Sequence, residues 1–174
     1  QISGSFNKGF EFSGHIRPST GGVISLGASL IEAQTGATGG SMNKGTAFVA
    51  GGVYGTSRET CACHQQYNGT SWSEGTAINT ARIGPTFAGV QNDGILYGGN
   101  PYSPQGICTE EWNGSAWTEV ADLNTSRGGI DGGPMGTATA ALAAGGYKYN
   151  SPSGAKLLTE NWNGSSWTEV NDLN

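Results

Sequence analysis

Short runs in which apolar and polar residues alternate recur along the chain, and most of them lie close to glycines. Between residues 157 and 162, Leu, Thr and Asn alternate with Leu, Glu and Trp, which is the two-residue period of a β-strand. A second kind of run is continuously apolar and closes with two glycines; its copies occupy residues 48–52, 95–99 and 141–146. Each apolar run follows another short strand candidate and precedes an alternating run. The pattern predicts repeated units of four short strands.

A six-residue motif is embedded in the alternating runs: an aromatic residue, Asn-Gly, two small residues and then Trp. The motif ends at Trp72, Trp117 and Trp167, so it recurs at intervals of 45 and 50 residues. Such intervals are typical of propeller blades and not of helical solenoids. Asn-Gly predicts a tight hairpin, because both turn residues adopt positive φ readily. We expect the three tryptophans to be buried between repeat units.

The order of these features resembles the kelch repeat, whose fold is a β-propeller. The resemblance rests on the glycine pair, an aromatic residue 13 to 16 residues later, Trp five residues beyond it, and an Arg that closes the unit. Arg82 and Arg127 hold this last place. The structural positions that the resemblance implies are Gly51, Gly52, Trp72, Gly98, Gly99, Trp117, Gly145, Gly146 and Trp167. It implies an all-β fold with three kelch-like blades of four strands and an incomplete ring.

We place the repeat units at residues 33–80, 81–125 and 126–174. Residues 1–32 carry no blade motif and are expected to form a β-rich connector or stalk-joining segment. Propellers usually close with about four to eight blades, so three units do not complete a typical ring. We therefore expect either further blades beyond residue 174 or an oligomer in which several chains combine.

A narrower resemblance concerns function. The stretch from Thr109 to Arg127 reads TEEWNGSAWTEVADLNTSR and is similar to the kelch-like repeats of tailed-phage fibres, other virion proteins and some bacterial surface proteins. This resemblance implies a virion appendage protein, or alternatively an extracellular or cell-surface one. Its partners would be other virion or assembly subunits and a host-surface glycan or protein. The alternatives are a structural subunit with the propeller as a rigid spacer, and a secreted carbohydrate-active enzyme.

Composition narrows the possible partners. The chain has 31 glycines and 6 prolines in 174 residues, which suits an all-β protein rich in turns. Its net charge is −5 and it has no basic cluster, whereas nucleic-acid binding depends on Lys and Arg that neutralise phosphates. No apolar run approaches the roughly 20 residues of a membrane span. We therefore expect neither nucleic-acid binding nor membrane insertion.

The cysteines are interpreted through the repeat. Aligning the motifs places Cys63 opposite Cys108 and Leu158, which predicts a buried apolar position, since free Cys behaves as a small hydrophobe. A disulfide between Cys63 and Cys108 is the alternative, and Cys61 is expected to be peripheral. The sequence Cys61-x-Cys63-His64 has no second ligand pair at the spacing of a zinc site. We expect no metal and no cofactor.

Repetition also argues against catalysis. Glu74, Glu119 and Glu169 each follow a motif tryptophan by two residues. Catalysis needs a few groups in one asymmetric constellation, whereas residues repeated once per unit lie far apart. We therefore expect no enzyme activity and no catalytic residues.

Three loops break the repeat and are the expected place of function. They follow the glycine pairs, at residues 53–59, 100–105 and 147–153, and are expected to lie on one rim of the propeller. Exposed tyrosines beside small polar residues suit stacking on sugar rings or contact with a protein; ordinary solvated turns are the alternative. The candidate ligand-binding residues are Tyr54, Arg58, Tyr102, Tyr147, Lys148 and Tyr149.

Overall fold

The computed structural model describes residues 28–43, 45–54, 59–99, 104–130, 135–147 and 157–173. This part of the chain contains β-strands, turns and one short 3-10 helix, η1 (Pro104–Ile107). The prediction of an all-β fold with four-stranded units is confirmed. No helix in the described ranges is long and apolar enough to cross a membrane.

Twelve of the strands form three antiparallel sheets, each with four strands in chain order. The first sheet contains β2 (Thr38–Asn43), β3 (Thr46–Ala50), β5 (His64–Tyr67) and β6 (Trp72–Glu74). The second contains β7 (Thr86–Val90), β8 (Asp93–Tyr97), β9 (Thr109–Trp112) and β10 (Trp117–Glu119). The third contains β11 (Gly136–Thr137), β12 (Ala140–Ala144), β13 (Thr159–Trp162) and β14 (Trp167–Val170). Outside these sheets, β1 (Gln34–Thr35) pairs with β4 (Val53–Tyr54).

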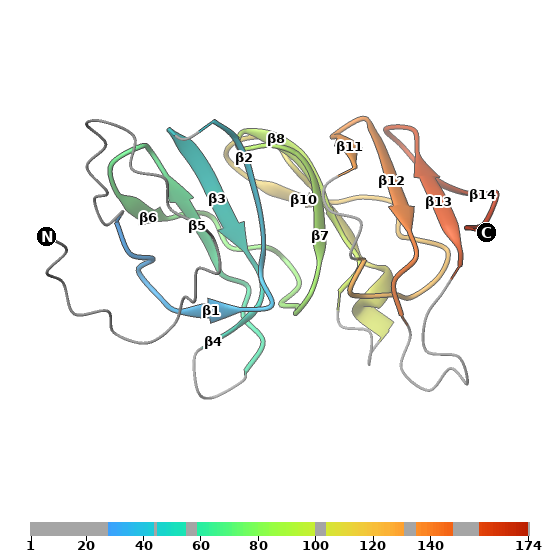
Figure 1. Cartoon of the computed structure of the whole chain (residues 1–174), viewed down its shortest axis with the longest axis horizontal. Helices are drawn as coiled ribbons and strands as arrows, with labels where there is room; N and C mark the ends of the chain where they lie inside the picture. The colour runs from blue at the N-terminus through green and yellow to red at the C-terminus, as the bar shows by residue number, and fades with distance from the viewer. Residues whose placement is uncertain are drawn as a thin grey trace, which may run out of the picture.

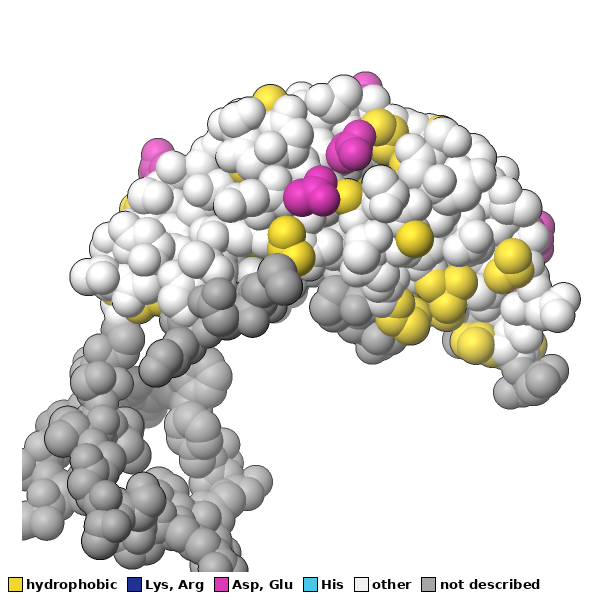
Figure 2. Space-filling view, turned by 90° about the horizontal axis from the view of Figure 1, so that it is seen from above, with side chains coloured by type: hydrophobic (Ala, Val, Ile, Leu, Met, Phe, Trp, Pro, Cys, Tyr) yellow, Lys and Arg dark blue, Asp and Glu magenta, His cyan; other side chains and the backbone are white. Residues whose placement is uncertain are grey.

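The three sheets lie side by side in chain order (Figure 1). The first strands of neighbouring sheets contact each other, since β2 contacts β7 and β7 contacts β11. The sheets are therefore closest along their first strands, and β6, β10 and β14 form the opposite edges. Seen from above, the described part of the chain has an arched outline (Figure 2).

The Asn-Gly hairpins differ from the expected two-residue turn. Tyr67 pairs directly with Trp72, so the loop between β5 and β6 has four residues. The Asn68 side-chain oxygen accepts hydrogen bonds from the backbone N–H groups of Thr70 and Ser71, both at 3.0 Å. Gly69 has a φ of 95°, which glycine adopts without strain. The other two motifs repeat this arrangement, so the asparagine is required for its side-chain acceptor.

Two apolar clusters fill the spaces between the sheets. Phe48 and Ala50 of the first sheet pack against Phe87, Leu96 and the two tryptophans of the second sheet's hairpin. The same arrangement is repeated between the second and third sheets by residues Ile95, Tyr97, Ala141, Ala143, Trp162 and Trp167. The last-strand tryptophan of each later sheet thus packs on the sheet before it. Trp117 and Trp167 are each 6% exposed, as expected. Trp72 is only half-buried, because no earlier sheet lies against it in the described ranges.

The glycine pairs allow the sheets to approach closely. Gly51 has a φ of 68°, and a Cβ added to it would lie 2.8 Å from the carbonyl oxygen of Arg82. The neighbouring Gly52 N–H donates to that same carbonyl at 2.8 Å. Gly98 and Gly99 stand in the same relation to the carbonyl of Arg127. Each of these pairs therefore joins its sheet to the segment that leads into the next one.

Candidate functional site

Three equivalent segments, which we name closing segments, precede the sheets at residues 31–36, 79–84 and 124–129. The second carries Asn79, Thr80 and Arg82. All three of these residues bind the buried carboxylate of Glu110 on β9, through the N–H groups of Asn79 at 2.7 Å and Thr80 at 3.1 Å and through the Arg82 guanidinium. Arg82 also donates to the carbonyl oxygens of Gly98 and Cys108.

The third closing segment repeats these bonds around Glu160. Arg127 forms a buried ion pair with Glu160 and donates to the carbonyl oxygens of Gly145 and Leu158. The Asn124 N–H donates to the Glu160 carboxylate at 2.8 Å. Both carboxylates are thus buried and fully hydrogen-bonded within the protein, so they hold the closing segments and have no access to a ligand.

The first sheet has neutral residues at both positions of the buried arginine–glutamate pair. Gln34 stands where Arg82 and Arg127 stand, and Gln65 stands where Glu110 and Glu160 stand. The Gln65 side chain nevertheless holds the start of the closing segment, whereas the Gln34 amide donates to the Cys61 sulfur. The N–H of Ile31 donates to the Gln65 side-chain oxygen at 2.8 Å, and the Gln65 amide donates to the Glu32 carbonyl at 3.1 Å. A neutral amide at both positions avoids leaving one buried charge without its partner.

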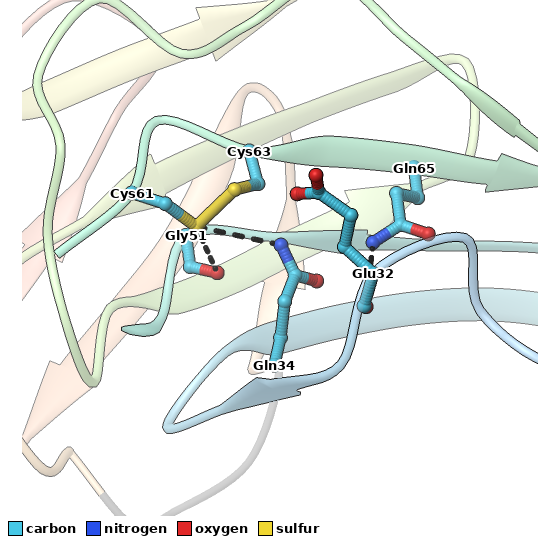
Figure 3. The surroundings of a disulfide bond; sticks show 6 residues. All are labelled: Glu32, Gln34, Gly51, Cys61, Cys63 and Gln65. Carbon is cyan, nitrogen blue, oxygen red and sulfur yellow. Dashed lines mark hydrogen bonds between the residues drawn. A yellow bond between two sulfur atoms is a disulfide. The ribbon is translucent and has the colours of Figure 1, made fainter. Parts of the chain in front are cut away.

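A disulfide lies beside this neutral pair (Figure 3). It joins Cys61 to Cys63, and Cys108 is a free thiol. The Cys61 sulfur accepts a hydrogen bond from the Gln34 amide at 3.4 Å and lies 3.6 Å from the Gly51 carbonyl oxygen. The expectation that Cys63 is a free buried cysteine is therefore wrong, and so is the alternative of a Cys63–Cys108 disulfide. So is the peripheral placement of Cys61, which is buried, whereas Cys63 and Cys108 are only half-buried.

The candidate site is an open cavity of about 260 Å³ next to the disulfide. Its rim carries the side chains of Glu32, Tyr54 and Glu74, all of them exposed. The remaining lining residues are Ala62, Cys63, His64, Gln65, Gly75 and Ala77. The cavity thus combines one aromatic ring with two carboxylates at the solvent boundary, which suits a polar or positively charged group with some apolar surface.

The cavity exists because the first sheet carries small residues at repeat positions that are larger elsewhere. Ala62 corresponds to Ile107 and Leu157. Gly75 corresponds to Val120 and Val170. Ala77 corresponds to Asp122, whose carboxylate accepts the Thr109 N–H in the second sheet. The feature breaks the repeat, and an aligned comparison of the three motifs would have pointed to it.

His64 replaces a repeated threonine at the wall of the cavity. Its counterparts are Thr109 and Thr159. A Cβ on Gly75 would lie 2.6 Å from His64 Nδ1, so the larger ring and the missing valine side chain accompany each other. The ring is buried and makes edge contacts with Phe48, Trp112 and Trp117.

The proton of His64 is placed by its hydrogen bond. Nδ1 lies 2.9 Å from the Thr76 carbonyl oxygen, which can only accept, so Nδ1 donates to it. The Trp117 indole nitrogen lies 3.4 Å from Nδ1, and its N–H donates to the same carbonyl oxygen at 3.1 Å. Within the described residues, Nε2 is buried and has no hydrogen-bond partner. Burial lowers the pKa of His64, while the bond to Thr76 raises it by a smaller amount. The imidazole is therefore neutral near pH 7, with a bare lone pair on Nε2.

Of the candidate tyrosines from the loops that follow the glycine pairs, the described residues include Tyr54 and Tyr147. Tyr54 is 39% exposed and lines the cavity. Tyr147 is 38% exposed, bridges to Gly128 and does not line the cavity. The other candidates, Arg58, Tyr102, Lys148 and Tyr149, lie outside the described residues.

The repeated carboxylates occupy exposed strand positions. Glu74, Glu119 and Glu169 are all exposed, and of the three Glu74 lines the cavity. In the described ranges, no group of three or more His, Cys, Asp and Glu side chains is placed to hold a metal ion.

Comparison with known proteins adds no family. No protein-family model matches the chain, and no curated protein has a significantly similar sequence.

Proposed function

We propose that the chain is a non-enzymatic binding module with the architecture of a kelch-like β-propeller, and that it belongs to a virion appendage such as a phage tail fibre. The propeller is supported by the contacts between β2, β7 and β11 and by the repeated packing of Trp117 and Trp167 on the preceding sheet. The virion setting is supported by the resemblance of residues 109–127 to repeats of that class.

The observation that carries the binding role is the cavity of the first sheet. The two buried ion pairs, Arg82 with Glu110 and Arg127 with Glu160, hold the closing segments and are not exposed to a ligand. The cavity instead occurs in one sheet, where Ala62 and Gly75 replace larger residues. A ligand without internal symmetry needs such an unrepeated surface.

The proposed ligand is a host-surface glycan, or a protein side chain with similar polarity. Tyr54 offers an exposed ring face on which a sugar ring can stack. Glu32 and Glu74 offer carboxylate acceptors for hydroxyl or ammonium groups. Exposed acceptors and one aromatic ring fit a weak contact that many copies of an appendage would strengthen by avidity.

Binding to a glycan array and adsorption to a panel of bacterial hosts would test this role. Filling the cavity with Ala62→Ile and removing the ring with Tyr54→Ala should each reduce binding by about 30-fold or more, because contacts at a true binding centre are worth about 2 kcal/mol. Matched controls are Tyr147→Ala, a tyrosine of equal exposure on the third sheet, and Glu119→Gln, the counterpart of Glu74.

Three outcomes separate the alternatives. Loss of binding in the cavity variants with both controls intact supports the proposal. Loss in Tyr147→Ala alone would move the site to the third sheet. Full binding in the cavity variants, with their folds intact, would contradict a role for the cavity and favour the rigid spacer.

A further inference from the structure

The third sheet exposes apolar side chains at positions that are covered in the second sheet. Leu157, Val170 and Leu173 are 60%, 41% and 47% exposed. Their repeat counterparts, Ile107, Val120 and Leu123, pack into the cluster between the second and third sheets. We name Leu157 and Val170, with Leu142 and Ala144 on β12, the open face.

The backbone at the open face is already arranged as it is between the sheets. The N–H of Leu173 donates to the Leu157 carbonyl at 2.9 Å, as the N–H of Leu123 donates to the Ile107 carbonyl at 3.0 Å. On β12, Leu142 and Ala144 are half-buried, whereas their counterparts Ile95 and Tyr97 are completely buried. The open face is therefore a ready-made half of an interface that the chain builds twice internally.

A buried hydroxyl on the third sheet, that of Thr159, indicates where a tryptophan of a partner would bind. In the second sheet, the Thr109 hydroxyl accepts a hydrogen bond from the Trp167 indole N–H at 3.2 Å. The equivalent hydroxyl on the third sheet, Thr159 Oγ1, is buried and has no hydrogen-bond partner within the described residues. A buried hydroxyl without a partner is unfavourable, and an indole N–H at the same relative place would satisfy it.

The first sheet presents the other half of this interface. The side chains that face a preceding sheet are Leu96, Trp112 and Trp117 in the second sheet, and all are buried. Their counterparts in the first sheet are Val49, Tyr67 and Trp72, which are only half-buried. The chain thus carries a tryptophan edge at one end and the matching open face at the other.

We propose that the open face binds the first sheet of a second copy of this chain, head to tail, with Trp72 of one copy placed against Thr159 of the other. The occupant follows from continuity with the two internal interfaces, because each half carries apolar or aromatic residues at the repeat positions of a half that is already paired. Two copies would together supply six sheets, which lies within the four to eight blades of a typical propeller, so the proposed closed assembly is a pair of copies. This association uses surfaces other than the cavity and does not rest on ligand binding.

Two leucines occupy the same repeat position in the proposed complex, and this gives a test of its register. Leu173 and Leu30 each stand at the place that Ile78 and Leu123 occupy, directly before a closing segment. In the head-to-tail complex, Leu173 of one copy and Leu30 of the other therefore compete for one position. Removal of residues 171–174 should leave the association unchanged or tighten it, and a clear weakening would contradict the proposed register.

Sedimentation equilibrium of the full chain over a range of concentrations is the direct test. We expect self-association to twice the 17.8 kDa mass. Leu157→Asp and Val170→Asp on the open face, and Trp72→Ala on the opposite edge, should each weaken it by roughly 30-fold or more, as for central interface residues. Thr139→Asp introduces the same charge at an exposed position at a hairpin tip of the third sheet and should have no effect.

A mixing experiment separates head-to-tail association from pairing of two open faces. Trp72→Ala retains its open face and Leu157→Asp retains its tryptophan edge, so a mixture of the two should regain one interface that neither variant forms alone. A chain that stays monomeric at all concentrations would overturn the proposal. Association that survives Trp72→Ala but not Leu157→Asp would also overturn it, since two open faces would then be paired. Circular dichroism of each variant checks that it is folded.

Discussion

The guanidinium of Arg82 is completely buried against the carboxylate of Glu110, and the two residues belong to different parts of the repeat. Arg82 lies on the segment that leads out of the first sheet, whereas Glu110 lies on the third strand of the second. In the first sheet, the two positions are occupied together by Gln34 and Gln65. The same two repeat positions therefore hold a buried ion pair in one sheet and two neutral amides in another.

Arg82→Gln or Glu110→Gln alone should lower the free energy of unfolding by about 3–5 kcal/mol, because each leaves a buried charge without its partner. The double variant reproduces the neutral pair of the first sheet, so its loss should be clearly smaller than the sum of the two. Urea denaturation of the four proteins in a double-mutant cycle measures this coupling. Additive losses would show that the ion pair does not act as a unit.

The tryptophans should differ in their contribution to stability. Trp117→Ala should lower the free energy of unfolding by about 3–5 kcal/mol, the range for truncation of a buried large aromatic residue. Trp72→Ala should cost much less, because Trp72 is half-buried and its indole N–H donates to the carbonyl of Ala28, an exposed residue. Thermal and urea unfolding of dilute protein, where association is absent, gives both values. Equal losses at the two positions would be inconsistent with this packing.

His64 should make stability depend on pH. Its pKa in the folded chain is lowered by burial, so below the ordinary value of about 6.5 the unfolded state binds more protons than the folded one. The contribution is therefore complete above about pH 6.5 and is lost as the pH falls. Denaturant unfolding between pH 7.5 and 5 measures the slope.

A matched variant isolates this histidine. His64→Thr introduces the residue found at the same position of the other two sheets, and combining it with Gly75→Val restores their full pattern. Either variant should flatten the pH dependence. His15→Gln removes the other histidine and serves as the control. A slope that persists in His64→Thr would assign it to other groups.

Thiol counting checks the disulfide. Of the three cysteines, Cys108 alone should react with a thiol reagent in the unreduced protein, and Cys108→Ser should leave none. The reaction should be slow, because burial raises the pKa of the Cys108 thiol and so reduces its reactive thiolate. Three reactive thiols in freshly purified protein would refute the Cys61–Cys63 bond.

The strand order and the burial of Trp117 and Trp167 could be predicted from the sequence, because periodic positions carry the same physical requirement in every unit. The disulfide could not be predicted in this way. Alignment compares Cys63 with Cys108 because they share a repeat position, but equivalent positions in neighbouring sheets lie far apart in space. The true partner, Cys61, is two residues away and has no cysteine counterpart in the other units.

The cavity is not predicted by the repeat for a related reason. Recurring residues such as Glu74 and Glu119 define the repeat, whereas the cavity lies where a recurring large residue is absent. Ala62, Gly75 and Ala77 are ordinary residues when each is taken alone, and only the occurrence of all three small residues in one sheet indicates an open space beside His64. The turn at Asn68 was predicted from backbone preference, whereas its side-chain oxygen decides the loop length.

The contacts of Arg82 also make the stability of one sheet depend on the formation of the next. Its carbonyl receives the N–H of Gly52, whereas its side chain is fixed by Glu110, which is synthesised almost thirty residues later. The hydrogen bond between a glycine pair and the next closing segment is therefore stabilised only when the following sheet has formed. The same holds for Arg127 and Glu160. Adjacent sheets therefore stabilise each other in pairs, as adjacent repeats do in repeat proteins. A nascent chain gains stability stepwise, and damage to the second sheet would loosen both of its neighbours at once.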